Sequence, residues 1–330
     1  MNFQLFDAGA NPEDRMFRIA NAVIIAAALA LGAPARAADL TIVEVAGPGS
    51  LLARAAQLLQ PALEQALGGK VTIETMQGEG GGTALAALAT AKPDGSRVVL
   101  VELLGRTVSE AVRNAKPTLA SLTPIAKLTS ALSGALVVPE NSPIKSWSDF
   151  AAAAKSKRLK LAAAGQETAF GDGILVYKAQ LERVTGARID TLTIGGRSEE
   201  YTSALTTGGA DAALMVTFAV ATYTSPAMRP LITFGAQRSP LYTSTPTINE
   251  VSKERIALTG ALGVYAPPGL SKKTAEALTA AFVAAAQAPD VVQIVAARNL
   301  PIEVSGPAEV RANLARNRRI VAQLLPLLQR

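Results

Sequence analysis

The segment 71–101 restricts the possible folds of this chain most strongly. It contains an apolar run at 70–76, a glycine-rich run at 78–82, an alanine-rich stretch, and a second apolar run at 97–101. This pattern predicts a strand–helix–strand unit, in which the strands are parallel and the crossover is right-handed. Glycines after the first strand leave backbone N–H groups accessible, and the N-terminal end of the following helix is positive. The segment therefore predicts a parallel sheet with a loop suited to an anion.

Strands and helices alternate along most of the chain. We predict strands at 40–46, 70–76, 97–101, 135–139, 159–163, 190–194, 212–216, 231–235 and 260–266. We predict helices at 50–67, 83–91, 148–156, 170–185, 199–206, 272–287, 289–297 and 307–327. The pattern is typical of an α/β fold, and the residues after position 37 are too many for one core.

We therefore expect two α/β domains. Domain 1 combines residues 39–132 and 262–330, and domain 2 comprises residues 133–261. Each domain should be a mostly parallel sheet flanked by helices, and two crossing strands should join the domains as a hinge. The helices at the end of the chain should pack back on domain 1.

The chain contains no histidine and no cysteine. Zinc, haem and iron–sulfur sites depend mainly on these residues, as do the Ser-His-Asp and Cys-His mechanisms. The G-x-S-x-G elbow and the G-x-x-x-x-G-K-[ST] phosphate loop are also missing from the sequence. We expect no metal, no cofactor and no enzymatic activity, although a Ser–Lys or all-carboxylate mechanism stays formally open.

Residues 1–37 carry a targeting pattern. Arg18 precedes an apolar run at 19–31, and the small-residue sequence Ala35-Arg36-Ala37 follows. This is typical of a secretory signal peptide cleaved after Ala37, with 1–15 as a dispensable extension or the result of a start codon assigned too far upstream. The alternative is a membrane anchor, but the run is shorter than the roughly 20 residues that span a bilayer. Because no cysteine stands at the cleavage site, we expect a periplasmic protein that is not a lipoprotein.

The net charge of +6 is spread over the sequence. Lysines and arginines are scattered over 145–160, 183–197 and 311–319 with few aromatic residues among them, so no stacking platform for nucleic acid is indicated. A diffuse positive field favours anionic solutes or an acidic membrane face, and a merely solvated basic surface is the simpler interpretation. We expect a monomer that binds no nucleic acid.

Three predicted strand-to-helix junctions are alike, at 46–50, 78–83 and 164–168. In open parallel sheets, ligands bind outside the carboxyl ends of the strands, where such junctions lie. Facing each other across a cleft, the three would offer helix N-termini and hydroxyl groups to a small carboxylate. Taken singly, each is better explained as an ordinary turn with glycine for tight geometry.

Short motifs distributed over nearly the whole chain after position 37 carry a family resemblance. They are Ala53-Arg54, the run at 78–81, Lys92-Pro93-Asp94-Gly95, 122–126, 163–166, Arg238-Ser239-Pro240, 246–250 and 262–269. In this order and spacing they resemble the substrate-binding proteins of tripartite tricarboxylate transporters, also called the Bug family of extracytoplasmic solute receptors. The resemblance implies a two-domain periplasmic-binding-protein (Venus-flytrap) fold. It also implies capture of a small organic carboxylate and its delivery to integral-membrane permease subunits.

The resemblance further implies ligand contacts from one loop of each domain. Carried over by position, the ligand-binding residues are Gly47, Pro48, Gly49 and Ser50 in domain 1, Gly165, Gln166, Glu167 and Thr168 in domain 2, and Gly80 and Gly81 along the cleft. Thr217 is added because relatives begin a helix facing the pocket near this region, and Glu102 is added from its own place directly after the strand at 97–101. No residue is expected to be catalytic or to bind a metal.

Several positions depart from the family pattern. Ser50 stands where an aspartate is usual, and Gly82 stands where an asparagine is common. The acids Glu79, Glu102, Glu167 and Asp172 fall near the predicted cleft, where they would repel an anionic ligand unless paired but would attract an amino group or a cation. Arg106 and Arg197 are candidate partners of these acids or candidate clamps for the ligand. The ligand therefore stays open, as do the alternatives of a periplasmic sensor and of an enzyme on the same scaffold.

Overall fold

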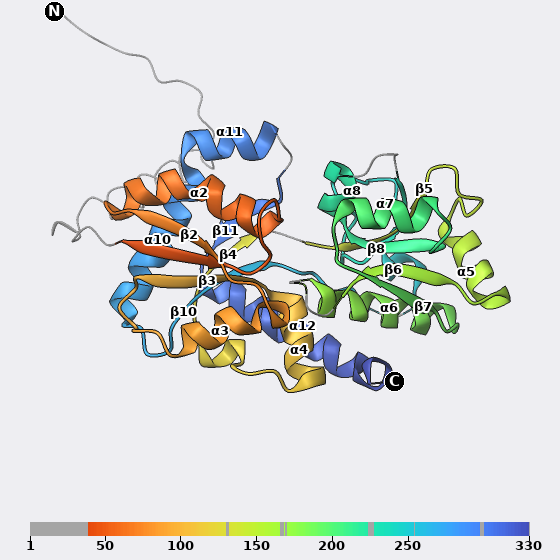
Figure 1. The fold of residues 1–330 in the computed structure, drawn as a ribbon, viewed down its shortest axis with the longest axis horizontal. Helices are drawn as coiled ribbons and strands as arrows, with labels where there is room; N and C mark the ends of the chain where they lie inside the picture. The colour runs from red at the N-terminus through yellow and green to blue at the C-terminus, as the bar shows by residue number, and fades with distance from the viewer. Residues whose placement is uncertain are drawn as a thin grey trace, which may run out of the picture. The chain divides into compact units, whose positions relative to one another are not determined.

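The structure is a computed structural model that describes residues 39–129, 132–165, 168, 170–223, 228–253, 255–297 and 300–329. The predicted extension and signal peptide at 1–37 lie outside these residues, as do Gln166 and Glu167. Residues 38–330 form one compact unit. Within that unit the strands form two separate sheets (Figure 1).

The first sheet has six strands in the order β11-β4-β10-β3-β1-β2. We call this sheet and its helices the first lobe. Its strands are β1 (Leu40–Glu44), β2 (Val71–Thr75), β3 (Arg97–Glu102), β4 (Thr123–Thr129), β10 (Leu262–Ala266) and β11 (Ile302–Ser305). Its helices are α2 (Leu51–Leu67), η1 (Glu79–Gly81), α3 (Gly82–Ala89), α4 (Leu103–Arg113), η2 (Leu119–Ser121), α10 (Lys272–Gln287), α11 (Pro289–Ala297) and α12 (Pro307–Leu328).

The second sheet has five strands in the order β7-β6-β8-β5-β9. We call this sheet and its helices the second lobe. Its strands are β5 (Gly134–Pro139), β6 (Lys160–Ala164), β7 (Asp190–Ile194), β8 (Ala212–Val216) and β9 (Met228–Thr233). Its helices are α5 (Trp147–Ser156), α6 (Gly171–Thr185), α7 (Ser198–Thr206), α8 (Thr217–Tyr223) and α9 (Ile248–Val251).

The predicted α/β class with two sheets is confirmed, but the sheets are mixed rather than mostly parallel. In the first sheet β1 is parallel to β2 and β3, whereas β10 is antiparallel to β3 and β4, and β11 is antiparallel to β4. In the second sheet β6 is parallel to β7 and β8, and β5 is antiparallel to β8 and β9. The chain leaves the first sheet along β4 and returns along β10. Outgoing and returning strands that pair must run in opposite directions, which is why the prediction was wrong on this point.

Two chain segments connect the sheets, one after β4 and one before β10. They lie side by side at Leu132 and Gly260, which exchange backbone hydrogen bonds of 2.9 and 2.7 Å. The predicted domain boundaries near these residues stay a prediction, as does the hinge.

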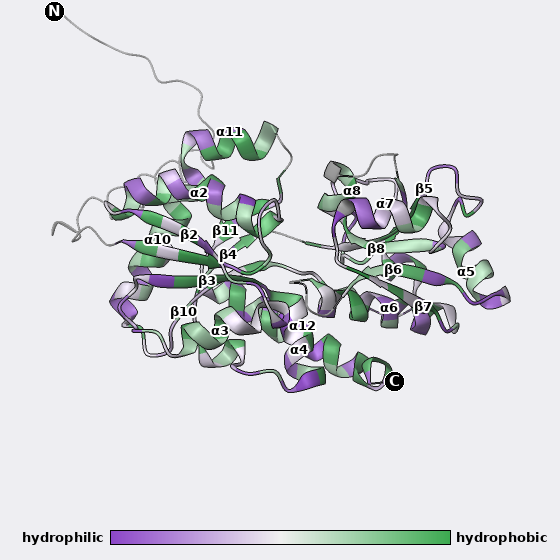
Figure 2. Ribbon diagram, in the orientation of Figure 1, coloured by the Kyte–Doolittle hydropathy of each residue, from purple (hydrophilic) through white to green (hydrophobic). Residues whose placement is uncertain are grey.

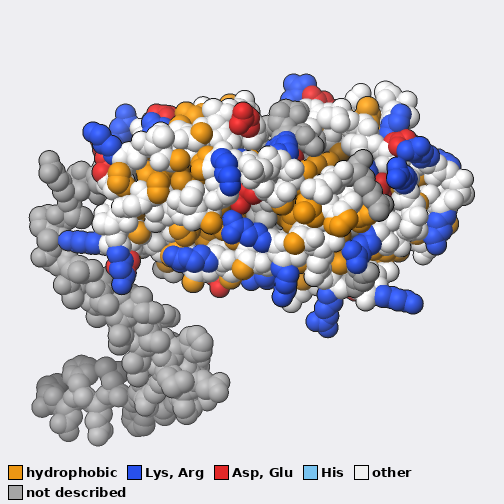
Figure 3. Space-filling view, turned by 90° about the horizontal axis from the view of Figure 1, so that it is seen from below, with side chains coloured by type: hydrophobic (Ala, Val, Ile, Leu, Met, Phe, Trp, Pro, Cys, Tyr) orange, Lys and Arg blue, Asp and Glu red, His pale blue; other side chains and the backbone are white. Residues whose placement is uncertain are grey.

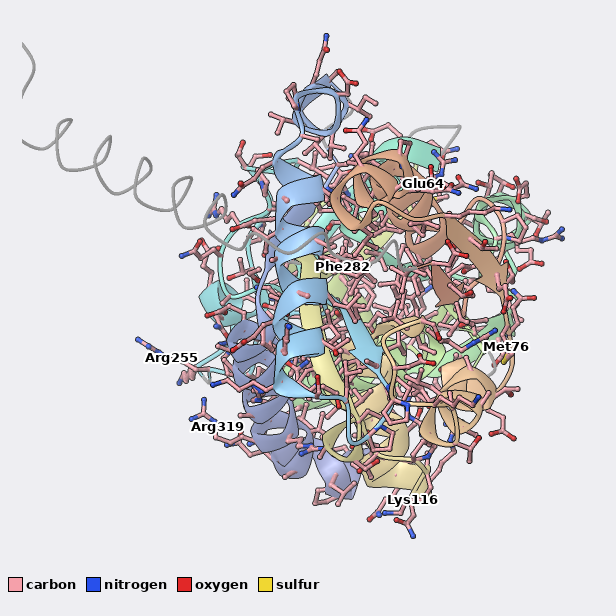
Figure 4. The ribbon with its side chains drawn as sticks, turned by 90° about the vertical axis from the view of Figure 1, so that its left-hand side faces the viewer. Glu64, Met76, Lys116, Arg255, Phe282 and Arg319 are labelled. Atoms are coloured by element: carbon pink, nitrogen blue, oxygen red, sulfur yellow. The ribbon has the colours of Figure 1, made fainter. Side chains whose placement is uncertain are left out.

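Helices cover both faces of each sheet. In Figure 1, α2 lies above the first sheet and α3 and α4 lie below it, while α7 and α6 lie above and below the second sheet. Figure 2 shows that hydrophobic positions predominate along the strands, whereas the helices carry both hydrophilic and hydrophobic positions. Phe282 of α10 is buried in the first core, whereas the exposed side chains of Lys116, Arg255 and Arg319 project from the periphery (Figure 4).

The C-terminal helix α12 packs on the first lobe, through α4 and β4, and it also contacts α6 of the second lobe. Among the described helices, no single one is long and apolar enough to cross a membrane. The pair α10 and α11 passes that test together but is bent by 59°.

Helix α4 is the element that matters most for the site and was not predicted. Its buried face carries Arg106, Thr107 and Ser109 beside Leu103, Leu104 and Val108. These polar residues interrupt the regular spacing of apolar residues, every three to four positions, from which an amphipathic helix is predicted. Strands β4 and β11 and the short helices α8 and α9 were also missed.

Candidate functional site

The buried carboxylate of Glu44 closes the turn between β1 and α2. Its Oε2 accepts hydrogen bonds from the N–H groups of Ala46 (2.8 Å) and Gly47 (2.9 Å), and the hydroxyl of Thr75 donates to Oε1. Gly47 has a positive φ of 88°, and a Cβ there would lie 2.6 Å from the amide nitrogen of Gln77. These N–H groups, which were predicted to face an anion, are therefore already paired with a carboxylate of the protein itself.

The remaining residues of this loop are Pro48, Gly49 and Ser50. Pro48 and Gly49 are exposed, and the Ser50 hydroxyl accepts a hydrogen bond of 3.1 Å from the N–H of Ala53 as the N-cap of α2. The guanidinium of Arg54 donates to the Gly49 carbonyl at 3.0 Å. In this structure the Ser50 hydroxyl caps the N-terminus of α2.

The glycine-rich run packs against the first sheet. Gly80 and Gly81 are buried, with positive φ angles of 60° and 93°. A Cβ on Gly81 would lie 3.3 Å from the Cγ2 atoms of both Val45 and Val101. Glycine at this position is explained by close packing at the ends of β1 and β3.

Arg106 of α4 lies beside the glycine-rich run. Its side chain is 1% exposed, and Nη2 donates to the Pro117 carbonyl at 2.7 Å, while Nε has no hydrogen-bond partner among the residues that the structure describes. Burial lowers the pKa of Arg106. A Cβ on Gly82 would lie 3.2 Å from its Nη1. The other candidate clamp, Arg197, is 76% exposed and pairs with Glu200 at 3.1 Å.

Glu102 ends β3 and caps α4. Its Oε1 accepts from the N–H of Leu104 at 3.0 Å, and its Oε2 accepts from the N–H of Gly105 at 2.6 Å. The side chain is 3% exposed. Burial raises the pKa of Glu102 to about 7, although the backbone N–H groups of Gly105, Leu104 and Ala261 act in the opposite direction.

A small cavity lies where α4, the two connecting segments and α6 meet. It is lined by Glu102, Leu104, Leu132, Ser133, Phe170, Gly173, Ile174, Tyr177, Val216 and Gly260. Its volume is about 20 Å³, enough for one water molecule. Of the predicted site residues that the structure describes, Glu102 lines this cavity, whereas the loops at 47–50 and 80–81 do not.

The second lobe contributes the loop after β6 and the start of α8. Gly165 donates to the Ile194 carbonyl at 2.9 Å, and its own carbonyl accepts from the N–H (3.1 Å) and the hydroxyl (2.9 Å) of Thr168. Thr217 is 5% exposed, and its N–H donates to the carbonyl of the cavity residue Ser133 at 2.9 Å. Gln166 and Glu167 lie outside the described residues.

Helices α4 and α6 make a close contact beside the cavity. A Cβ on Gly173 would lie 3.4 Å from the backbone nitrogen of Gly105. Asp172 accepts a hydrogen bond from the Ser109 hydroxyl and forms an ion pair with Arg113. Burial raises the pKa of Asp172, while Ser109 and Arg113 oppose that rise. Asp172, predicted as an acid of the cleft, is therefore partly neutralised by Arg113.

The cavity also contains residues that the sequence did not single out. Tyr177 packs so closely on the start of β5 that a Cβ on Gly134 would lie 2.4 Å from its ring. A tyrosine inside an amphipathic helix gives no signal of such a role, and neither does Ser133. Glu44 could have been noticed, since it is an acid at the end of an apolar strand and directly precedes a glycine turn.

The family model for the tripartite tricarboxylate transporter family receptor, TctC, matches residues 54–317. The chain belongs to this receptor family. The family predicted from the sequence motifs is thus confirmed, and the match spans strands of both lobes of the TctC-family receptor.

Solved structures agree on the fold of this TctC-family receptor. MatC from Rhodopseudomonas palustris with bound malate has 23% identity and a TM-score of 0.70, and the alignment covers 86% of this chain and 98% of the MatC chain. An R. palustris protein with adipate has 20% identity and a TM-score of 0.73, over 88% and 97% of the two chains. A TctC solute-binding protein from Polaromonas, without ligand, has 19% identity and a TM-score of 0.71, over 87% and 98%. No curated protein sequence matches the chain.

Proposed function

We propose that this TctC-family receptor captures a small organic carboxylate in the periplasm and delivers it to the membrane subunits of a tripartite tricarboxylate-type permease. The observation that carries the proposal is the family match over 54–317. Malate and adipate are present in the structures of two similar proteins. The signal-peptide pattern at 1–37 supports a periplasmic location. The proposed role is binding and delivery, without catalysis.

The proposed binding site lies around the cavity at Glu102. The loop from Gly165 to Thr168 would supply N–H and hydroxyl groups to the ligand carboxylate, with Thr217 nearby, and the turn from Gly47 to Ser50 would approach from the first lobe. The connecting segments at Leu132 and Gly260 would act as the hinge between the two proposed domains. A ligand favours the closed state only through contacts that it makes there and not in the open state.

Ligand screening tests this proposal. Purified receptor is screened by thermal shift against mono-, di- and tricarboxylates, amino acids and nicotinate-like acids, and bound molecules are identified by native mass spectrometry. A true ligand raises the Tm with its concentration and is recovered chemically unchanged. If nothing stabilises the protein, or if only cations do, the carboxylate proposal fails. A chemically altered ligand would indicate an enzyme instead.

The delivery step needs its own test. Co-purification of the receptor with permease subunits supports transport. Co-purification with a membrane signalling protein in their place would assign the receptor to sensing.

A further inference from the structure

Two backbone sites of the first lobe that could hold an anion are filled by the protein's own carboxylates. Glu44 takes the N–H groups of Ala46 and Gly47 at the end of β1, and Glu102 takes those of Leu104 and Gly105 at the end of β3. β1 and β3 are parallel neighbours, so both sites lie at the same edge of the sheet. A ligand carboxylate placed at this edge would lie beside the carboxylates of Glu44 and Glu102, and the backbone N–H groups there are already hydrogen-bonded to those two side chains.

The two glutamates differ in what else they face. Glu44 has a further donor in the Thr75 hydroxyl and does not line the cavity. Glu102 does line it, and among the described residues no lysine or arginine nitrogen lies within 4.0 Å of its carboxylate. Its oxygens accept from the backbone N–H groups of Leu104 and Gly105, the N–H of Ala261 also acts on the carboxylate, and capacity for a further donor is left. Glu102 is therefore a buried acceptor without a cationic partner.

The surroundings of Glu102 suit one small cationic group. The cavity holds about one water molecule, and an ammonium group is of similar size. Tyr177 of α6 is the other titratable residue on the lining, and burial raises its pKa, so it stays neutral at ordinary pH. The remaining lining residues carry no charge.

We propose that Glu102 receives the ammonium group of the ligand, so that this receptor selects amino-bearing carboxylates over carboxylates of the same chain that lack the amino group. The assignment rests on the proposed function, because it concerns the same site. The ligand carboxylate would then be held by the second lobe, at Gly165 and Thr168. Pairing with an ammonium group compensates a buried charge that otherwise has only neutral donors.

Matched ligand pairs test the proposal. Aspartate and succinate, glutamate and glutarate, and alanine and propionate differ only by the amino group. Affinities are measured by isothermal titration calorimetry at pH 8 for the wild type, Glu102→Gln and Glu44→Gln. Glu44→Gln is the matched control, because it alters a buried capping carboxylate on the neighbouring strand that does not line the cavity.

The amino member of a binding pair should bind at least about tenfold more tightly to the wild type, as expected for a charge-assisted hydrogen bond. Glu102→Gln should reduce that ratio to near one. Glu44→Gln should leave the ratio within about twofold, whatever it does to each affinity. If Glu102→Gln does not fold, the wild type at pH 5.5 gives the same test, because protonation of Glu102 should shrink the ratio.

The contrary results are distinct. If carboxylates bind but the amino members have no advantage, or if the ratio survives in Glu102→Gln, the assignment of Glu102 is overturned while the proposed function stands. If no carboxylate of either kind binds, the proposed function falls and the assignment with it.

Discussion

The junctions after β1 and after β3 are built in the same way and differ in their setting. Each strand ends in a buried glutamate, and the carboxylate of that glutamate accepts hydrogen bonds from the backbone N–H groups at the start of the following segment. Glu44 has three donors in a closed turn, including the Thr75 hydroxyl. Glu102 has only backbone donors, the N–H groups of Leu104, Gly105 and Ala261, and it lies on a cavity beside residues of the second lobe.

This difference separates a structural carboxylate from a functional one. At Glu44 two backbone N–H groups and the Thr75 hydroxyl bind the carboxylate, so its contribution is to hold the turn. At Glu102 burial outweighs the donors, and the pKa is raised to about 7. A group kept in a costly environment at the edge of a cavity is a candidate for ligand contact. The overall positive charge offers no such guidance, because Lys and Arg side chains are scattered over the face in Figure 3.

Removing each carboxylate should separate the two junctions most clearly. Glu44→Ala leaves the N–H groups of Ala46 and Gly47 and the Thr75 hydroxyl without their partner, so it should cost about 3 kcal/mol or more. Glu102→Ala also loses a cap, but it removes a buried charge, so at pH 8 it should cost only about 1 kcal/mol. Urea unfolding at pH 8 gives both values, and a larger loss in Glu102→Ala would reverse the comparison.

Glu102 should contribute a distinct part of the pH dependence of stability. Its pKa is about 7 in the folded protein against an ordinary 4.5, so its stabilising contribution is present in full below pH 4.5 and is lost as the pH rises through 7. Relative to Glu102→Gln, the wild type should therefore lose about 2–3 kcal/mol of unfolding free energy between pH 5 and pH 8. Parallel curves for the two proteins in urea titrations would show that this carboxyl is not perturbed.

A substitution in the ligand loop of the second lobe should change the affinity for the ligand rather than the stability of the protein. Gly165→Val places a side chain in the loop proposed to hold the ligand carboxylate and should weaken binding more than about tenfold, which is about 1.4 kcal/mol. Gly306→Val is the matched control, because among the described residues a Cβ at Gly306 would meet only Thr279 Cγ2, at 3.6 Å. Calorimetric titration with the ligand found by screening gives both affinities, and unchanged binding in Gly165→Val would remove that loop from the site.

The smallest effect should come from the Ser50 hydroxyl. Ser50→Ala removes the N-cap of α2 and should cost about 1 kcal/mol. Ser271→Ala removes the equivalent N-cap of α10, whose hydroxyl accepts from the N–H of Thr274 at 3.1 Å, and should cost about the same. Thermal unfolding compares the two. A loss of ligand affinity confined to Ser50→Ala would show that this hydroxyl contacts the ligand as well as the helix.

The sequence predicted local elements well and long-range relations poorly. The alternation of apolar strands and amphipathic helices was enough to predict β7 and α10 with the bounds observed. It missed α4, because Arg106, Thr107 and Ser109 are buried on that helix. The direction of β10 depends on its meeting β3 and β4, which are far away in the chain.

The candidate site shows the same limit. Glu102 was predicted as a ligand contact from its place after a strand. Its neighbours Tyr177 and Gly260 come from distant segments, so neither the cavity nor the raised pKa could be foreseen. The glycine-rich run predicted the receptor family correctly, but Gly81 packs on Val45 and Val101 rather than lining that cavity.

The most direct test of the account is the number of protons exchanged when the ligand binds at pH 7. Calorimetric titration in two buffers of different ionisation enthalpy gives this number and its sign. An ammonium group placed on Glu102 favours the ionised carboxylate, so binding should release roughly half a proton, and Glu102→Gln should release none. Proton uptake by the wild type, or the same release in both proteins, would contradict the assignment of Glu102 to the ligand's amino group.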